Sequence, residues 1–135
     1  MSIYKMYPKD KFAVVRFKTG DLYIDEILRI NKAYKEDKDY SNIHFLVMIF
    51  LDCNPIFNEK DLENLAKEYS TNEQTNNHIR SVFLVDGPKT TAFAHLVQTH
   101  TPEQSYYCST YEKAYEFLCP GISFSDFLDK IKMTE

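Results

Sequence analysis

Two segments of this chain are apolar on both alternating faces, and they constrain the fold more than any other feature. They are Phe45–Leu51 and Val82–Val85. A strand with two apolar faces must be covered on both sides, which is typical of a sheet that lies between helices. Phe45–Leu51 is also the longest apolar run, and it is far shorter than the roughly 20 residues that span a bilayer. We therefore expect no membrane insertion.

A helical pattern follows each of these runs. Asn58 is positioned to cap a helix with an apolar stripe behind it, and Pro88 stands at the first position of another. The polar tract 70–78 follows the first of these helices without periodicity. The other expected elements are strands at 3–7, 12–17 and 105–108 and helices at 21–36 (with Asp21 as its N-cap), 109–118 and 124–131.

The order of these elements predicts the fold class. A short polar turn joins the first two strands into a hairpin, and strands and helices then alternate. The sequence predicts a layered α/β domain whose sheet of about five strands is mixed but mostly parallel, with helices on its faces. Because 135 residues suit one domain, we expect 1–135 to form a single unit, with 122–133 as an appended C-terminal helix.

Composition excludes several classes of protein. The 16 basic and 20 acidic residues give a net charge of −4, which argues against binding to nucleic acid. Three cysteines (Cys53, Cys108 and Cys119) lack zinc-site spacing, so we expect reduced thiols and no metal. The chain shows no secretory signal pattern at its start, and we expect a cytoplasmic protein. Three glycines cannot supply the nucleotide-binding motifs, so no cofactor is expected.

Candidate site residues follow the two buried strands. In open α/β sheets, sites lie beyond the carboxyl ends of the strands. That rule selects a crevice with two acidic residues, which would hold a cation, position a water or only cap the following helices. Its residues are Asp52, Cys53, Asn54, Asp86, Lys89, Thr90 and Thr91.

Catalytic motifs are missing from the sequence. It contains no HExxH or GxSxG pattern, so we expect no enzymatic activity. The ten tyrosines cannot all lie in a core without partners for their hydroxyls. Some should therefore be exposed, and exposed tyrosine favours a protein interface.

The layout resembles the STAS-like domains, the group that contains anti-sigma-factor antagonists and the tail domains of sulfate transporters. The most similar members are the small, stand-alone proteins of the stage II sporulation protein AA type. The residues that carry this resemblance are Phe12–Phe17, Phe45–Asp52 and the stretch from Arg80 to Leu118, above all Val82–Asp86, Thr91–Ala94 and Tyr111–Leu118. The resemblance implies a signalling module that binds a protein partner.

One feature of that family is missing. Its best-known mechanism phosphorylates a serine in a loop at the start of the helix after the central strand. The corresponding loop here is Asp52–Asn58, and no Ser or Thr occurs between Asn42 and Tyr69. Since phosphorylation of this kind needs a hydroxyl, only Asp52 carries over, as the acid at the strand end.

Three functional hypotheses therefore stand. The first is a non-enzymatic cytoplasmic STAS-like module that binds a protein partner or a small ligand. The second is a receiver-like or small phosphotransfer enzyme that uses Asp52, although the acidic pair and the lysine of receivers are missing. The third is a homodimeric structural or interaction protein, in which the stripe Phe124, Phe127, Leu128 and Ile131 packs on a second copy.

Overall fold

The computed structural model describes residues 1–75, 79–100 and 105–135, without the side chains of residues 66, 69–75 and 100. Its five-stranded sheet has the order β1-β2-β4-β6-β7, and β3 and β5 form a separate two-stranded sheet. The strands are β1 (Ile3–Tyr7), β2 (Phe12–Arg16), β3 (Gly20–Tyr23), β4 (Phe45–Phe50), β5 (Cys53–Ile56), β6 (Arg80–Val85) and β7 (Ser105–Cys108). The α-helices are α1 (Ile24–Lys35), α2 (Glu59–Thr75), α3 (Pro88–His100), α4 (Tyr111–Leu118) and α5 (Phe124–Lys132), with short 3-10 helices η1 (Pro8–Asp10) and η2 (Tyr40–Asn42).

The main sheet is mixed, as the sequence predicts. β1 and β2 are antiparallel and are joined through η1, and every other pair in this sheet is parallel. Val14, Val47 and Val82 lie side by side in register across β2, β4 and β6. The hairpin, the five strands and the mostly parallel pairing are therefore confirmed.

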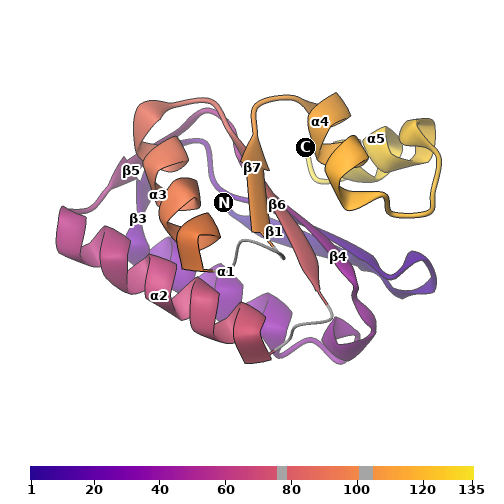
Figure 1. Ribbon diagram of the computed structural model, residues 1–135, viewed down its shortest axis with the longest axis horizontal. Helices are drawn as coiled ribbons and strands as arrows, with labels where there is room; N and C mark the ends of the chain where they lie inside the picture. The colour runs from indigo at the N-terminus through magenta and orange to yellow at the C-terminus, as the bar shows by residue number, and fades with distance from the viewer. Residues whose placement is uncertain (76–78, 101–104) are drawn as a thin grey trace.

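Helices cover both faces of this sheet (Figure 1). One face packs against α1, α2 and α3, where Phe50 lies against Phe17, Phe83 and Phe93. The other face packs against α4 and α5. The two central strands bury side chains on both sides, which explains why their sequences carry no polar alternation.

The stripe on α5 is buried against this chain's own sheet. Phe127 and Ile131 are 0% and 1% exposed, and the ring of Phe127 lies edge-on to Phe12 with centroids 5.6 Å apart. The apolar residues that suggested a second subunit therefore already have a partner within the chain.

The second sheet was not predicted. Gly20 has a φ of +80°, so the chain can turn after β2, and its N–H donates to the carbonyl of Asp52 at 2.8 Å. Leu22 and Pro55 then pair in register and are both buried. Asp21 consequently belongs to β3, and its prediction as an N-cap is wrong, because α1 begins only at Ile24.

Helix α2 continues further than the polar pattern suggested. It runs from Glu59 to Thr75, so most of the tract 70–78 is helical, and 76–78 lie outside the described residues. Neither glycine nor proline occurs between these two ends. Without a residue that breaks the helix, the loss of apolar periodicity did not mark the end of α2.

Candidate functional site: hollows around the start of α3

The predicted acidic pair does come together. The backbone N–H of Asp52 donates to Oδ2 of Asp86 at 2.9 Å. Asp52 has a φ of +57°, a left-handed conformation that non-glycine residues seldom adopt. The carboxylate of Asp86 thus holds the sharp turn between β4 and β5, and its contact with Asp52 is a structural one.

Cys53 and Asn54 also make contacts within the fold. The Sγ of Cys53 lies 3.2 Å from the carbonyl of Lys18. Burial, and then the negative charges of Asp86 and Asp52, raise the pKa of this thiol to about 12, so it is a poor nucleophile at neutral pH. The side-chain amide of Asn54 donates to Oδ1 of Asp21 at 2.9 Å, on the outer face of the β3–β5 sheet.

The two threonines at the start of α3 bond to one carbonyl. Both Thr90 Oγ1 and Thr91 Oγ1 donate to the carbonyl of Gly87, at 3.1 and 2.7 Å. Thr90 is buried, whereas Lys89 is exposed. Among the three candidate residues on α3, Lys89 therefore carries the charge, and it is exposed to solvent.

A polar hollow of about 360 Å³ lies between the start of α3 and the end of β7. The hydroxyl of Tyr107 lies 3.0 Å from Nδ1 of His95, and Cys108 Sγ lies 3.5 Å from the carbonyl of Thr110. Burial raises the pKa of the Cys108 thiol. The residues that line this polar hollow are Val85, Asp86, Gly87, Pro88, Thr91, Tyr107, Cys108 and Ser109.

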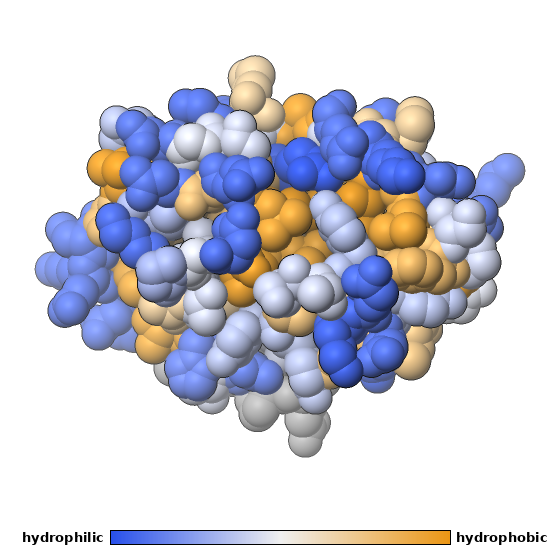
Figure 2. Space-filling view, turned by 90° about the horizontal axis from the view of Figure 1, so that it is seen from above, coloured by the Kyte–Doolittle hydropathy of each residue, from blue (hydrophilic) through white to orange (hydrophobic). Residues whose placement is uncertain are grey.

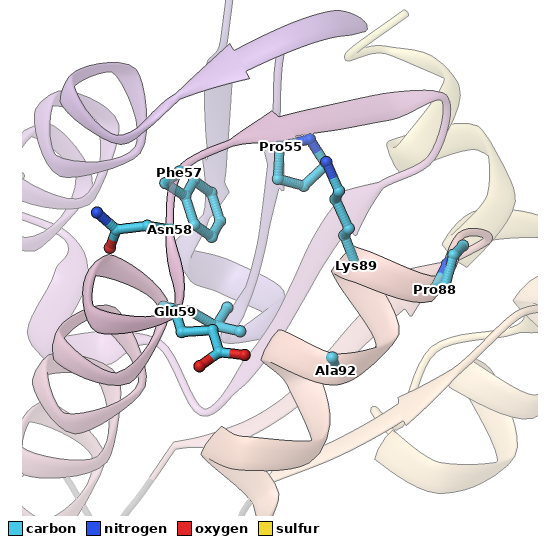
Figure 3. Close-up of a pocket in the computed structure, with 8 residues that line it drawn as sticks. Pro55, Phe57, Asn58, Glu59, Pro88, Lys89 and Ala92 are labelled. Atoms are coloured by element: carbon cyan, nitrogen blue, oxygen red, sulfur yellow. The ribbon is translucent and has the colours of Figure 1, made fainter.

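An apolar pocket of about 310 Å³ lies on the other side of α3, between β5 and the starts of α2 and α3 (Figure 3). Lys89 extends from α3 toward Pro55, while the carboxylate of Glu59 points toward the α3 side. The two charged groups therefore frame opposite parts of an apolar interior. The residues that line the apolar pocket are Pro55, Phe57, Asn58, Glu59, Leu62, Pro88, Lys89 and Ala92.

The start of α2 shapes this pocket. Asn58 Oδ1 accepts from the N–H of Asp61 at 2.9 Å, and the Asp61 carboxylate accepts from the N–H of Asn58 at 3.3 Å. This reciprocal pair is a capping box. Phe57 and Leu62 stand at the two positions of a hydrophobic staple, and both pack on the core while lining the pocket. The same residues that begin the helix thus form the pocket wall.

The face that carries the start of α3 has hydrophobic side chains near its middle, between hydrophilic ones (Figure 2). Sequence reasoning selected Lys89 among the residues that line the apolar pocket but missed Pro55, Phe57, Leu62 and Ala92. The spacing of Phe57 and Leu62 around Asn58 was the available signal, because a staple places an aromatic side chain beside a helix start.

Two further features bear on what this region can do. In the described part of the chain, no group of three or more His, Cys, Asp or Glu side chains is placed to hold a metal ion. Among the described helices, none is both long and apolar enough to cross a membrane.

Comparison with known proteins supports the fold alone. No family model and no curated protein sequence matches the chain. Among solved structures, the chain is similar to the anti-sigma factor antagonist SpoIIAA in its unphosphorylated form. The two have 13% sequence identity and a TM-score of 0.57, and the match covers 86% of this chain and 96% of that chain. The STAS-like fold implied by the sequence resemblance is therefore confirmed.

Proposed function

We propose that this protein is a non-enzymatic STAS-like module that binds a protein partner through the apolar pocket and the adjoining strand ends. The observation that carries the proposal is the pocket itself, where Phe57, Leu62 and Ala92 line a hollow framed by Lys89 and Glu59. Apolar pockets with a few charged groups at the rim suit a protruding partner side chain.

The polar residues of the crevice predicted from the sequence support the same proposal. Asp86 holds the Asp52 turn, Cys53 has a high pKa, and Thr90 and Thr91 bond to a backbone carbonyl. These groups serve the fold, so a small-ligand or catalytic role for the crevice has less support than a binding role for the pocket.

The similarity to SpoIIAA adds an analogy. That protein is described as an anti-sigma factor antagonist, so a regulatory, protein-binding role in the cytoplasm is the function we extend to this chain. We also propose that residues 1–135 act as one domain that includes α5. The start of α2 is capped here by Asn58, so no phosphorylated hydroxyl is assigned to this position.

The substitution Ala92→Glu tests the proposal. Ala92 is exposed on α3 and lines the pocket, so a glutamate would fill the hollow and bring a charge into it. Thr99→Glu is the matched control, because it adds the same charge to an exposed position two turns further along the same helix.

Each full-length variant should be cross-linked in cells and purified, and the proteins that co-purify should be quantified. We expect partners held by the wild-type protein to be lost from Ala92→Glu and retained by Thr99→Glu, with similar melting temperatures for both variants. An unchanged set of partners on a folded Ala92→Glu protein would contradict the assignment of the pocket.

A further inference from the structure

The two charged side chains that line the apolar pocket stand at the starts of two helices. Glu59 is the first residue of α2, and Lys89 follows Pro88 at the start of α3. Both side chains are exposed. Within the part of the chain that the structure describes, neither of them forms an ion pair. Both charges are therefore available to a group that enters the pocket.

The fold accounts for only one of these two charges. The first turn of a helix carries the positive end of the helix dipole, so an acidic side chain is stabilising there and a basic one is not. Glu59 and Asp61 bring the favourable sign to the first turn of α2. The first turn of α3 contains Lys89 and no acidic residue. Lys89 thus opposes the dipole of its own helix, and helix stability does not explain its charge.

The side chain of Lys89 is placed to touch whatever fills the pocket. It extends from α3 toward Pro55 and lines the hollow together with Phe57 and Leu62 (Figure 3). Its methylene stem can pack on an apolar occupant while the ammonium stays at the rim. An occupant that covers the rim takes water from this ammonium, and a charged group that loses water without gaining a partner is costly. Binding is therefore favoured when the occupant brings a negative charge to Lys89.

The size of the pocket and the position of Glu59 limit the occupant further. The pocket has a volume of about 310 Å³. Cavities for small molecules begin at about 300 Å³, so this hollow suits an apolar side chain better than a large cofactor. Glu59 frames the opposite part of the pocket from Lys89 and disfavours an acid there. The negative charge of the occupant is therefore accepted on the Lys89 side alone.

We propose that the partner segment whose apolar side chain enters the apolar pocket carries an acidic residue beside that side chain, and that Lys89 binds its carboxylate. This inference rests on the proposed function and adds the chemistry of the partner to it. The chain has a net charge of −4, so its overall field disfavours an acidic partner. A preference for an acidic segment must then come from a local contact, and Lys89 supplies that contact.

Two synthetic peptides that differ only in charge test the proposal, Ac-Ser-Asp-Leu-Leu-Asp-Ser-NH2 and Ac-Ser-Asn-Leu-Leu-Asn-Ser-NH2. An acid on each side of the leucines allows the segment to bind in either direction. Each peptide is titrated into the ¹⁵N-labelled full chain, and amide chemical shifts give both the affinity and the location of binding. We expect the acidic peptide to bind about threefold more tightly at low salt, because one exposed ion pair contributes modestly, and the preference to shrink as salt screens it. The shifts should include Phe57, Leu62 and Ala92.

The variant Lys89→Gln removes the charge and keeps most of the methylene stem, whereas Lys89→Arg keeps the charge. The matched control is Lys132→Gln, which removes the same charge from an exposed position on α5, on the other face of the sheet. The preference for the acidic peptide should disappear in Lys89→Gln and persist in the other two variants. Equal affinity of the two peptides for the wild-type chain, absence of binding by either, an unchanged preference in Lys89→Gln or a lost preference in Lys132→Gln would overturn the inference.

The Ala92→Glu variant separates this inference from the proposed function, and the neutral peptide is its readout. If Ala92→Glu weakens the neutral peptide while the wild type shows no preference for acid, the pocket assignment holds and the Lys89 assignment fails. If the neutral peptide binds Ala92→Glu as it binds the wild type, the pocket assignment fails, and the inference that rests on it fails too. If neither peptide binds, the inference is overturned, and the proteins that co-purify with Ala92→Glu still decide the proposed function.

Discussion

Two hollows of the structure contain carboxylates near strand ends but differ in what those groups contact. One is the polar hollow beside β7. The other, of about 540 Å³, lies beside β3, and we call it the acidic groove; it is lined by Met1, Lys18, Asp21, Tyr23, Asp25 and Glu26. In the polar hollow, the Asp86 carboxylate accepts from a backbone N–H, and Thr91 and Tyr107 bond to other groups of the fold. In the acidic groove, Asp25 and the ring of Tyr23 face solvent. Asp86 and Asp25 are both exposed, so the two hollows differ in the contacts that their carboxylates make within the fold.

This difference teaches how to interpret an acidic residue that follows a buried strand. Parallel strands bring their carboxyl ends to one edge, but the turns there also leave backbone N–H groups in need of acceptors. A carboxylate that meets such a donor stabilises the turn, and only one without that task is free for a partner.

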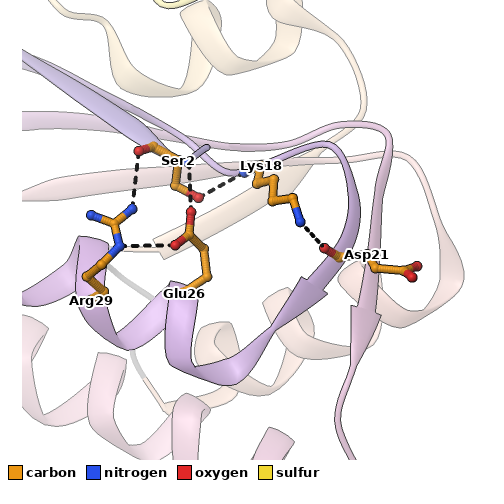
Figure 4. A network of polar contacts seen from close by, with 5 residues as sticks. All are labelled: Ser2, Lys18, Asp21, Glu26 and Arg29. Carbon is orange, nitrogen blue, oxygen red and sulfur yellow. Dashed lines mark hydrogen bonds and ion pairs between the residues drawn. The ribbon is translucent and has the colours of Figure 1, made fainter.

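The largest effect on stability is expected at Glu26, whose carboxylate accepts hydrogen bonds from Ser2 and Arg29 (Figure 4). Glu26→Ala removes an acceptor from Ser2 and Arg29 and should lower the free energy of unfolding by about 2 kcal/mol at neutral pH. Because its pKa falls from 4.5 to about 2 on folding, the contribution is complete above pH 4.5 and is lost as pH falls toward 2.

Urea unfolding of the wild type and Glu26→Ala at several pH values measures this effect. The difference between the two proteins should be largest near neutral pH and should shrink steadily below pH 4.5. Asp25→Asn is the control, since Asp25 is exposed on the same helix turn and should change stability little. If the difference in the free energy of unfolding stayed constant across this pH range, the charge of Glu26 would not stabilise the fold.

A smaller effect is expected at Asp86 in the polar hollow. Asp86→Ala leaves the N–H of Asp52 without this acceptor and should lower stability by about 1 kcal/mol, or the melting temperature by roughly 4 °C. Asp86→Asn keeps an oxygen acceptor and should recover most of the loss in thermal unfolding. If both substitutions left the melting temperature unchanged, the contact between Asp86 and Asp52 would contribute nothing to stability.

Asp52→Gly sharpens the same comparison. Glycine adopts the left-handed conformation at φ +57° without strain, so it should make the turn less dependent on the Asp86 contact. In the Asp52→Gly background, Asp86→Ala should therefore cost less than it does in the wild type. Additive losses would show that the two groups act independently.

The smallest effect concerns thiol reactivity and leaves stability unchanged. Cys119 is exposed, whereas the pKa of Cys53 is raised to about 12. At mildly alkaline pH, iodoacetamide should modify Cys119 first and Cys53 last, as followed by peptide mass spectrometry, because the thiolate is the reactive form. Cys119→Ser should remove the fastest phase. Rapid modification of Cys53 would show that the turn around Asp52 opens easily.

Much of the architecture could be predicted from the sequence. The runs Phe45–Leu51 and Val82–Val85 indicated a sheet covered on both sides, and they are the central strands β4 and β6. The two strands that were missed are only four residues each, and one of them contains Pro55. Short segments of this kind depend on pairing with each other across the chain, which local propensity does not describe.

Part of the candidate site could also be predicted from the sequence. Asp52 and Asp86 were expected to meet because parallel strands end at one edge, and they do. Tyr23 and Ile56 gave no comparable signal. Their exposure depends on which side of the β3–β5 pair faces the core, and Leu22 and Pro55 occupy that side.

The sequence by itself determined the layers, because apolar periodicity specifies which faces must be buried however the elements are connected. It also excluded the familiar nucleotide and catalytic motifs, which require particular residues at particular spacings. Only the tertiary structure decided which polar groups are free. Asp86 and Asp25 are both carboxylates in the printed sequence, and the difference between them is the backbone N–H of Asp52, brought to Asp86 from 34 residues away.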